Sequence, residues 1–247
     1  MSHTVRTTAK TALAVLVVVL AAAGLLLHAD VPQVPSNFWT PAGDMTSVRA
    51  GASATLLPNG LVLVAGGIDA NGATASVERF SPDGAHFLSG QPMQVPRANH
   101  TATLLADGRV LVVGGTGAGS TTEATAEIYD PSGPAWLPAG SLNVARRGHT
   151  ATRLPDGKVL IAGGDNNNVA IDSLEIFDPA TALFTIVDGA SIGARTLHAA
   201  AALLDGRVLI AGGFDGANPL ASTSIYDPET NTVSAGPDLS TPRYSLP

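Results

Sequence analysis

A sequence motif that repeats every 48 or 49 residues constrains the fold of this 247-residue chain more than any other feature. Each copy begins with an Arg, continues through a short β-prone run and an Asn-Gly or Asp-Gly pair, and ends on two glycines. The four glycine pairs are Gly66-Gly67, Gly114-Gly115, Gly163-Gly164 and Gly212-Gly213. Such a period predicts one supersecondary unit copied along the chain, with each copy stacked on its neighbours to bury an apolar face.

The second copy shows the order of elements within a unit. Asp107-Gly108 is a two-residue hairpin signal between two β-prone runs, and the second run is all apolar and too short for a helix. We expect four strands, over residues 100–105, residues 110–113, residues 124–129 and the segment around Trp136. Four antiparallel strands per unit, with adjacent sheets packed face to face, predict an all-β propeller of stacked blades.

A Gly-Gly pair followed by a Tyr and then a Trp, in units of about 50 residues, resembles the kelch repeat. The sequence from His100 to Gly115 also resembles the propeller domain of galactose oxidase. The resemblance covers residues 37–247 and implies a kelch-type β-propeller. The expected complete units are residues 49–96, 97–145, 146–194 and 195–242, with partial strands at 37–48 and 243–247. Kelch propellers usually close with about six or seven blades, so we interpret the sequence as a truncated propeller.

The first 29 residues resemble an export leader. Arg6 and Lys10 precede an uncharged apolar run over residues 11–27, which is typical of a signal peptide and is also near the minimum length for a membrane-spanning helix. We expect residues 1–29 to be a hydrophobic helix, either a cleaved signal or an uncleaved anchor, with a linker at 30–36. Both alternatives place the propeller outside the cytoplasm, in the periplasm or the extracellular space. Contact with a membrane is expected only through residues 11–27.

Composition narrows the function classes. The chain has no Cys, so disulfides and thiolate metal sites are excluded. Its net charge of -7 and the lack of a basic stripe argue against nucleic-acid binding. Residues 110–120 look like a strand followed by a Gly-rich dinucleotide-binding loop. That motif needs a helix after the loop, whereas the repeat predicts a third strand there, so dinucleotide binding is not expected.

Two residue types recur once per unit. For His100, His149 and His198, a metal or acid/base cluster is the alternative to the structural role that we favour. The Arg residues could form an anion-catching ring, or each could pair with a Glu of the third strand, which we favour because the Glu residues recur in step. Ser224 breaks that pattern in the fourth unit. The Arg residues are Arg49, Arg97, Arg146, Arg195 and Arg243, and the Glu residues are Glu78, Glu127 and Glu175.

The loops after the glycine pairs differ between units, and loops on a rigid scaffold commonly carry recognition. Candidate ligand contacts to a protein, to sugar hydroxyls or to Ca²⁺ are Asp165, Asn166, Asn167, Asn168, Asp69, Asn71, Asp215 and Asn218, joined by Arg97, Arg146 and Arg195 if the Arg ring faces a ligand. Asp and Asn are also ordinary turn residues, so the alternative is a purely structural role.

Two function classes remain. The favoured one is a non-catalytic module that binds a protein or a glycan on the loop face, with no catalytic residues, cofactor or resident metal. The alternative is a carbohydrate or alcohol oxidase, since the resemblance to galactose oxidase implies a copper site with two Tyr, two His and a Cys-Tyr crosslink. That cofactor cannot form without Cys, and Tyr129, Tyr226 and Tyr244 do not cluster in a motif.

Overall fold

The computed structural model describes residues 43–133 and 135–245. The expectations for the leader, the linker and residues 37–42 of the first partial strand lie outside these residues. Residues 43–48 and 243–245, which were expected to belong to partial strands, form no strand. The described chain is all-β, with twenty strands and one 3₁₀ turn, η1 (Ala118–Ser120). Within this part of the chain, no helix has the length and apolar character needed to cross a bilayer.

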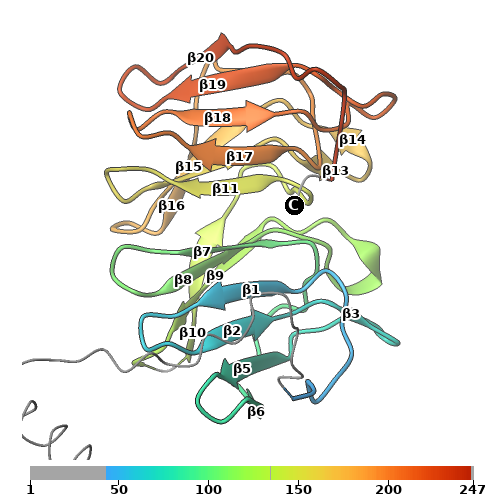
Figure 1. Ribbon diagram of the computed structural model, residues 1–247, viewed down its shortest axis with the longest axis vertical. Coiled ribbons are helices and arrows are strands. Elements are labelled where there is room, and N and C mark those ends of the chain that lie inside the picture. The colour runs from blue at the N-terminus through green and yellow to red at the C-terminus, as the bar shows by residue number, and fades with distance from the viewer. Residues whose placement is uncertain (1–42, 134, 246–247) are drawn as a thin grey trace, which may run out of the picture. The chain divides into compact units, whose positions relative to one another are not determined.

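The strands form four four-stranded antiparallel sheets, one per repeat, which follow one another in sequence order (Figure 1). Blade 1 contains β1 (Ser53–Leu56), β2 (Val62–Ala65), β5 (Val77–Ser81) and β6 (His86–Ser89). Blade 2 contains β7 (Thr101–Leu104), β8 (Val110–Val113), β9 (Thr125–Asp130) and β10 (Ala135–Ser141). Blade 3 contains β11 (Thr150–Arg153), β12 (Val159–Ala162), β15 (Leu174–Asp178) and β16 (Leu183–Ile186). Blade 4 contains β17 (Ala199–Ala202), β18 (Val208–Ala211), β19 (Thr223–Asp227) and β20 (Thr232–Ala235).

Two of the loops that follow the glycine pairs fold into short two-stranded ribbons. These are β3 (Ile68–Asp69) with β4 (Gly72–Ala73), and β13 (Asp165–Asn166) with β14 (Val169–Ala170). The loop of the second unit holds the turn η1 instead, and strand β9 follows it. The Gly-rich stretch at residues 110–120 therefore leads from strand to strand, as the repeat predicts.

The glycine pairs are required where consecutive units touch. Gly114 and Gly115 have φ values of 62° and 100°, which favour Gly because a side chain is strained there. The N–H of Gly115 donates to the carbonyl oxygen of Arg146 in the next unit at 2.9 Å. A Cβ on Gly114 would collide with that same carbonyl group. Each pair thus lets the next unit's backbone cross at close range.

Apolar side chains fill the space between neighbouring blades. Strand β8 contributes Val110 and Val112 to the core shared with blade 1, and Leu111 and Val113 to the core shared with blade 3. All four residues are buried, as expected for a strand covered on both faces. The third core lies between blades 3 and 4 and includes Leu160 and Ile210. Successive side chains of the second strand therefore pack alternately against the preceding and the following blade.

The aromatic spacing of seven residues places two rings opposite each other on the third and fourth strands. Tyr129 pairs with Trp136 in the strand register, and their ring centroids are 5.2 Å apart. Blades 1 and 3 contain the equivalent pairs, Phe80 with Phe87 at 5.1 Å and Phe177 with Phe184 at 4.8 Å. These contacts stabilise the outer hairpin of each blade.

The three repeated His residues connect neighbouring blades. Nε2 of His149 lies 2.9 Å from Oγ1 of Thr101, and His100 and His198 make the equivalent contacts to Ser53 and Thr150. Burial, together with the positive charge of the Arg in the same unit, lowers the pKa of His100 and of His198 from 6.5 to about 3. Burial also holds the pKa of His149 well below 6.5. The imidazoles are therefore neutral structural groups near pH 7.

We expect the free energy of unfolding to fall as the pH drops from about 6.5 towards 3. The unfolded chain binds protons at these imidazoles in that window and the folded chain does not, so each buried His removes about 1.4 kcal/mol per pH unit. Urea unfolding between pH 7 and pH 4 measures this slope. His149→Gln should reduce it, whereas replacing the exposed His86 with Gln should not. Equal slopes in the two variants would contradict the assignment.

Candidate functional site

A hollow of about 410 Å³ lies among the loops that follow the glycine pairs. Its wall comes from three consecutive units, with Asn99 from the second, Arg147 from the third and Thr196 from the fourth. Asp165 and Asn168 from the β13–β14 ribbon also line it, as does Phe214. The stacking of units therefore brings together side chains that lie far apart in the sequence. We refer to this hollow as the loop-face pocket.

A polar network shapes one side of the loop-face pocket. Nε of Arg147 donates to Oδ1 of Asp165 at 3.1 Å, and Nη2 of Arg147 donates to Oδ1 of Asn168 at 2.6 Å. The N–H of Asn168 donates to Oδ1 of Asp165 at 3.0 Å, and Oγ1 of Thr196 donates to Oδ2 of the same carboxylate at 3.2 Å. The Asp165 carboxylate therefore holds both the guanidinium group of Arg147 and the turn of the β13–β14 ribbon in place.

Apolar groups form the other side of the pocket. Leu197 has a φ of 54° and an exposed fraction of 42%. Gly51, Asn99 and Gly148 occupy the same position in the other units and also have positive φ, so the backbone conformation belongs to the repeat. A Leu there accepts local strain and presents an apolar side chain to solvent. Phe214, which also lines the pocket, packs against Tyr244 with ring centroids 5.4 Å apart.

Only two of the eight loop residues predicted from the sequence line this pocket, namely Asp165 and Asn168. Asn167 hydrogen-bonds to Thr122 of the second unit's loop, and Asn166 pairs with Val169 within the ribbon. The other four make local turns. Asp69 accepts the N–H of Asn71 at 2.7 Å, and Asp215 accepts the N–H of Asn218 at 2.6 Å. The backbone N–H groups around Asp215 lower the pKa of its carboxyl group.

Eight of the ten residues that line the pocket were not predicted from the sequence. Four of these eight are Arg147, Thr196, Leu197 and Phe214. Each of them departs from what the other units carry at its position, where Arg147 aligns with Ala50 and Ala98. A comparison of the units position by position marks these residues as different from their counterparts, but it does not show that they meet in one pocket. Among residues 43–133 and 135–245, no three His, Cys, Asp or Glu side chains are grouped so that they could hold a metal ion.

The repeated Arg residues lie inside the blades and not in the pocket. Arg97 and Arg146 are 0% exposed and Arg195 is 3% exposed, and none of the three lines the loop-face pocket. This corrects their inclusion among the candidate ligand contacts. For Arg97 and Arg146 the physical reason is the pairing with Glu that the sequence favoured.

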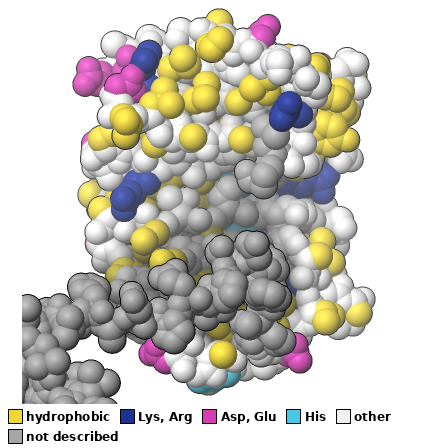
Figure 2. All heavy atoms as spheres, viewed as in Figure 1, with side chains coloured by type: hydrophobic (Ala, Val, Ile, Leu, Met, Phe, Trp, Pro, Cys, Tyr) yellow, Lys and Arg dark blue, Asp and Glu magenta, His cyan; other side chains and the backbone are white. Residues whose placement is uncertain are grey.

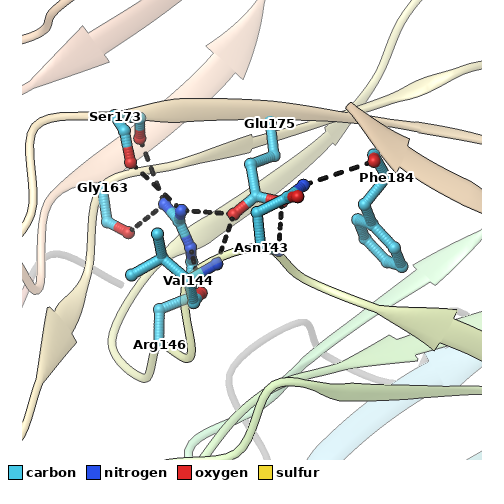
Figure 3. A network of polar contacts seen from close by, with 7 residues as sticks. All are labelled: Asn143, Val144, Arg146, Gly163, Ser173, Glu175 and Phe184. Atoms are coloured by element: carbon cyan, nitrogen blue, oxygen red, sulfur yellow. Dashed lines mark hydrogen bonds and ion pairs between the residues drawn. The ribbon is translucent and has the colours of Figure 1, made fainter. Parts of the chain in front are cut away.

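Arg146 shows this arrangement in full (Figure 3). Its Nη1 donates to the carbonyl oxygens of Gly163 and Ser173, and its Nη2 donates to Oε1 of Glu175 at 2.7 Å. Glu175 also accepts the N–H groups of Asn143 and Val144. Burial lowers the pKa of the Arg146 guanidinium, and the attraction of Glu175 offsets part of that effect. The ion pairs Arg49–Glu78 at 2.7 Å and Arg97–Glu127 at 2.9 Å repeat the geometry.

We expect Arg146→Ala to lower the free energy of unfolding by about 3 to 5 kcal/mol, because it leaves the Glu175 carboxylate buried without its partner. Arg109→Ala is the matched control, since Arg109 and Asp107 form an exposed ion pair that should contribute at most about 1 kcal/mol. Urea denaturation of both variants measures the difference. Equal losses would contradict a structural role for the buried pair.

Comparison with known proteins agrees with this architecture. A sequence model of the Kelch motif matches residues 96–143, 146–188 and 195–240, which together make up more than half of the chain. No curated protein sequence matches the chain. Kelch propellers generally bind proteins. With three matching motifs and four antiparallel blades, the chain belongs to the kelch-repeat family of β-propellers.

Proposed function

We propose that the chain is a non-catalytic binding module, exported or tethered to a membrane through residues 11–27, which holds a protein ligand in the loop-face pocket. One observation carries this proposal. Among the four described units, only the third has the network of Arg147, Asp165 and Asn168, and this network lies in the wall of the pocket. A rigid polar network beside exposed apolar side chains is typical of a recognition surface.

An oxidase is the weaker candidate. Two of the three Tyr residues, Tyr129 and Tyr226, lie in different blade cores, while Tyr244 packs on Phe214. The copper cofactor that the resemblance to galactose oxidase implies also needs a Cys, which the sequence lacks. The residues present therefore do not fit that group.

Site-specific photo-crosslinking tests the proposed binding. A photoreactive amino acid at Leu197, which lines the pocket, should crosslink to one protein when the full chain is expressed in its own cells. The same amino acid at the exposed Leu204 is the matched control. Arg147→Ala should abolish the crosslink at position 197. Labelling of a glycan in place of a protein, or equal labelling at both positions, would contradict the proposal.

A stability control shows that Arg147→Ala acts on binding and not on folding. The Arg147 side chain is 25% exposed, and without it the Asp165 carboxylate keeps the Asn168 N–H and the Thr196 hydroxyl as donors, so the expected loss in the free energy of unfolding is about 1 kcal/mol. Thermal unfolding of this variant beside Arg146→Ala measures the contrast. A loss as large as that of Arg146→Ala would mean that the network is structural.

Export is tested with the leader alone. Residues 1–36 fused to a reporter that is active only outside the cytoplasm should give activity. Replacing Leu25, Leu26 and Leu27 with charged residues should remove it, because charge is costly within an apolar signal segment. Equal reporter activity with and without the leader would contradict the proposal.

A further inference from the structure

The fourth blade lacks the carboxylate that completes the other three. Ser224 occupies the position of Glu78, Glu127 and Glu175, yet Arg195 remains buried at 3% exposure. Burial lowers the pKa of Arg195, and no carboxylate offsets this effect as Glu175 does for Arg146. The blade therefore buries a cation with no ionic partner among the described residues.

The corresponding sites in blades 2 and 3 show which group occupies the position of Ser224 there. In blade 3 the Glu175 carboxylate receives Nη2 of Arg146 at 2.7 Å and the N–H groups of Asn143 and Val144 at 2.8 and 3.2 Å. In blade 2 the Glu127 carboxylate receives Nη2 of Arg97 and two loop N–H groups in the same way. A guanidinium group and two backbone N–H groups thus form a cradle for one carboxylate.

In blade 4 part of this cradle is unfilled. Nη2 of Arg195 donates to Oγ of Ser222 at 3.1 Å, and the acceptor that Glu175 supplies in blade 3 has no counterpart in the described chain. Oγ of Ser224 donates to the carbonyl oxygen of Ile192 at 3.3 Å, and this oxygen also accepts Nε of Arg195 at 2.9 Å. The N–H of Ala194 has no acceptor among residues 43–133 and 135–245.

The loop above Arg195 leaves room beside its guanidinium group. Gly193 and Ala194 are exposed and carry almost no side chain, and the loop is one residue shorter than its counterpart at residues 142–146. Leaving aside its chain neighbours Ile192 and Ala194, a Cβ on Gly193 would have only Nη2 of Arg195 within 4 Å, at 3.6 Å. The space next to Nη2 is therefore open on the side of the exposed loop. Figure 2 shows one face of this uppermost blade, with hydrophobic side chains on its surface.

We propose that the fourth blade binds a small free carboxylate anion, of the size of formate or acetate, between Nη2 of Arg195 and the loop at Gly193 and Ala194. The anion takes the place that a Glu carboxylate occupies in the other blades. None of these three residues lines the loop-face pocket, so the test of this site does not require the proposed protein ligand.

Thermal unfolding of the full chain with increasing sodium formate, at constant ionic strength with sodium chloride, tests the site. The midpoint temperature should rise and saturate, because a ligand that binds only the folded state stabilises it. Ser224→Glu should raise the midpoint without formate and remove the response. Ser234→Glu adds the same charge on an exposed strand position and should keep the response. A response that persists in Ser224→Glu, or that chloride reproduces, overturns the proposal.

A direct measurement keeps the test valid if Ser224→Glu fails to fold. Line broadening of ¹³C-formate in the presence of the wild-type chain should reveal saturable binding, and acetate should compete. Glu175→Ser opens the same position in blade 3 beneath a longer loop, so formate should bind there too. Absence of saturable broadening with the wild-type chain overturns the proposal, and so does a Glu175→Ser variant that binds no more formate than the wild-type chain.

Discussion

The buried ion pair between the repeated Arg and Glu is the interaction on which three of the four described blades depend. The guanidinium group of Arg146 joins the end of the second strand, the start of the third strand and a carboxylate within it. Desolvating two charges is costly, and the arrangement is tolerated because each oxygen of Glu175 also receives a backbone N–H group. A planar fork with several donors is suited to this task, which a Lys could not perform.

Contacts between units depend on small residues and on neutral imidazoles. The second glycine of each pair donates to the carbonyl oxygen of the next unit's Arg, so the residue that anchors one blade also holds the previous blade. The His residues add a second connection, from each unit to the first strand of the unit before it. The loop-face pocket lies where these connections make the scaffold rigid, which is how loops of variable sequence keep a defined geometry.

Much of the fold could be predicted from the sequence, because the repeat samples the same pattern four times. The strand order, the hairpin turns, the aromatic pairs and the pairing of Arg146 with Glu175 all follow from residue periodicity. The pocket could not be predicted in the same way. Arg147 and Leu197 act through contacts with residues of neighbouring loops, and that geometry depends on how the units stack and on ribbon turns that no periodicity specifies.

The position of the hydrogen-bond donors to Glu175 determines where such chains can best be cut and recombined. Asn143 and Val144 lie just before Arg146, so the carboxylate is shared between the loop that ends one repeat and the strand of the next. A cut at Arg146 would separate these donors from their acceptor, whereas a cut before Leu142 keeps the donors, the Arg and the Glu on one piece. The unit that can be exchanged without losing these hydrogen bonds therefore begins at Leu142 and not at Arg146. Duplication or shuffling of whole blades should be tolerated best when the cuts follow that boundary.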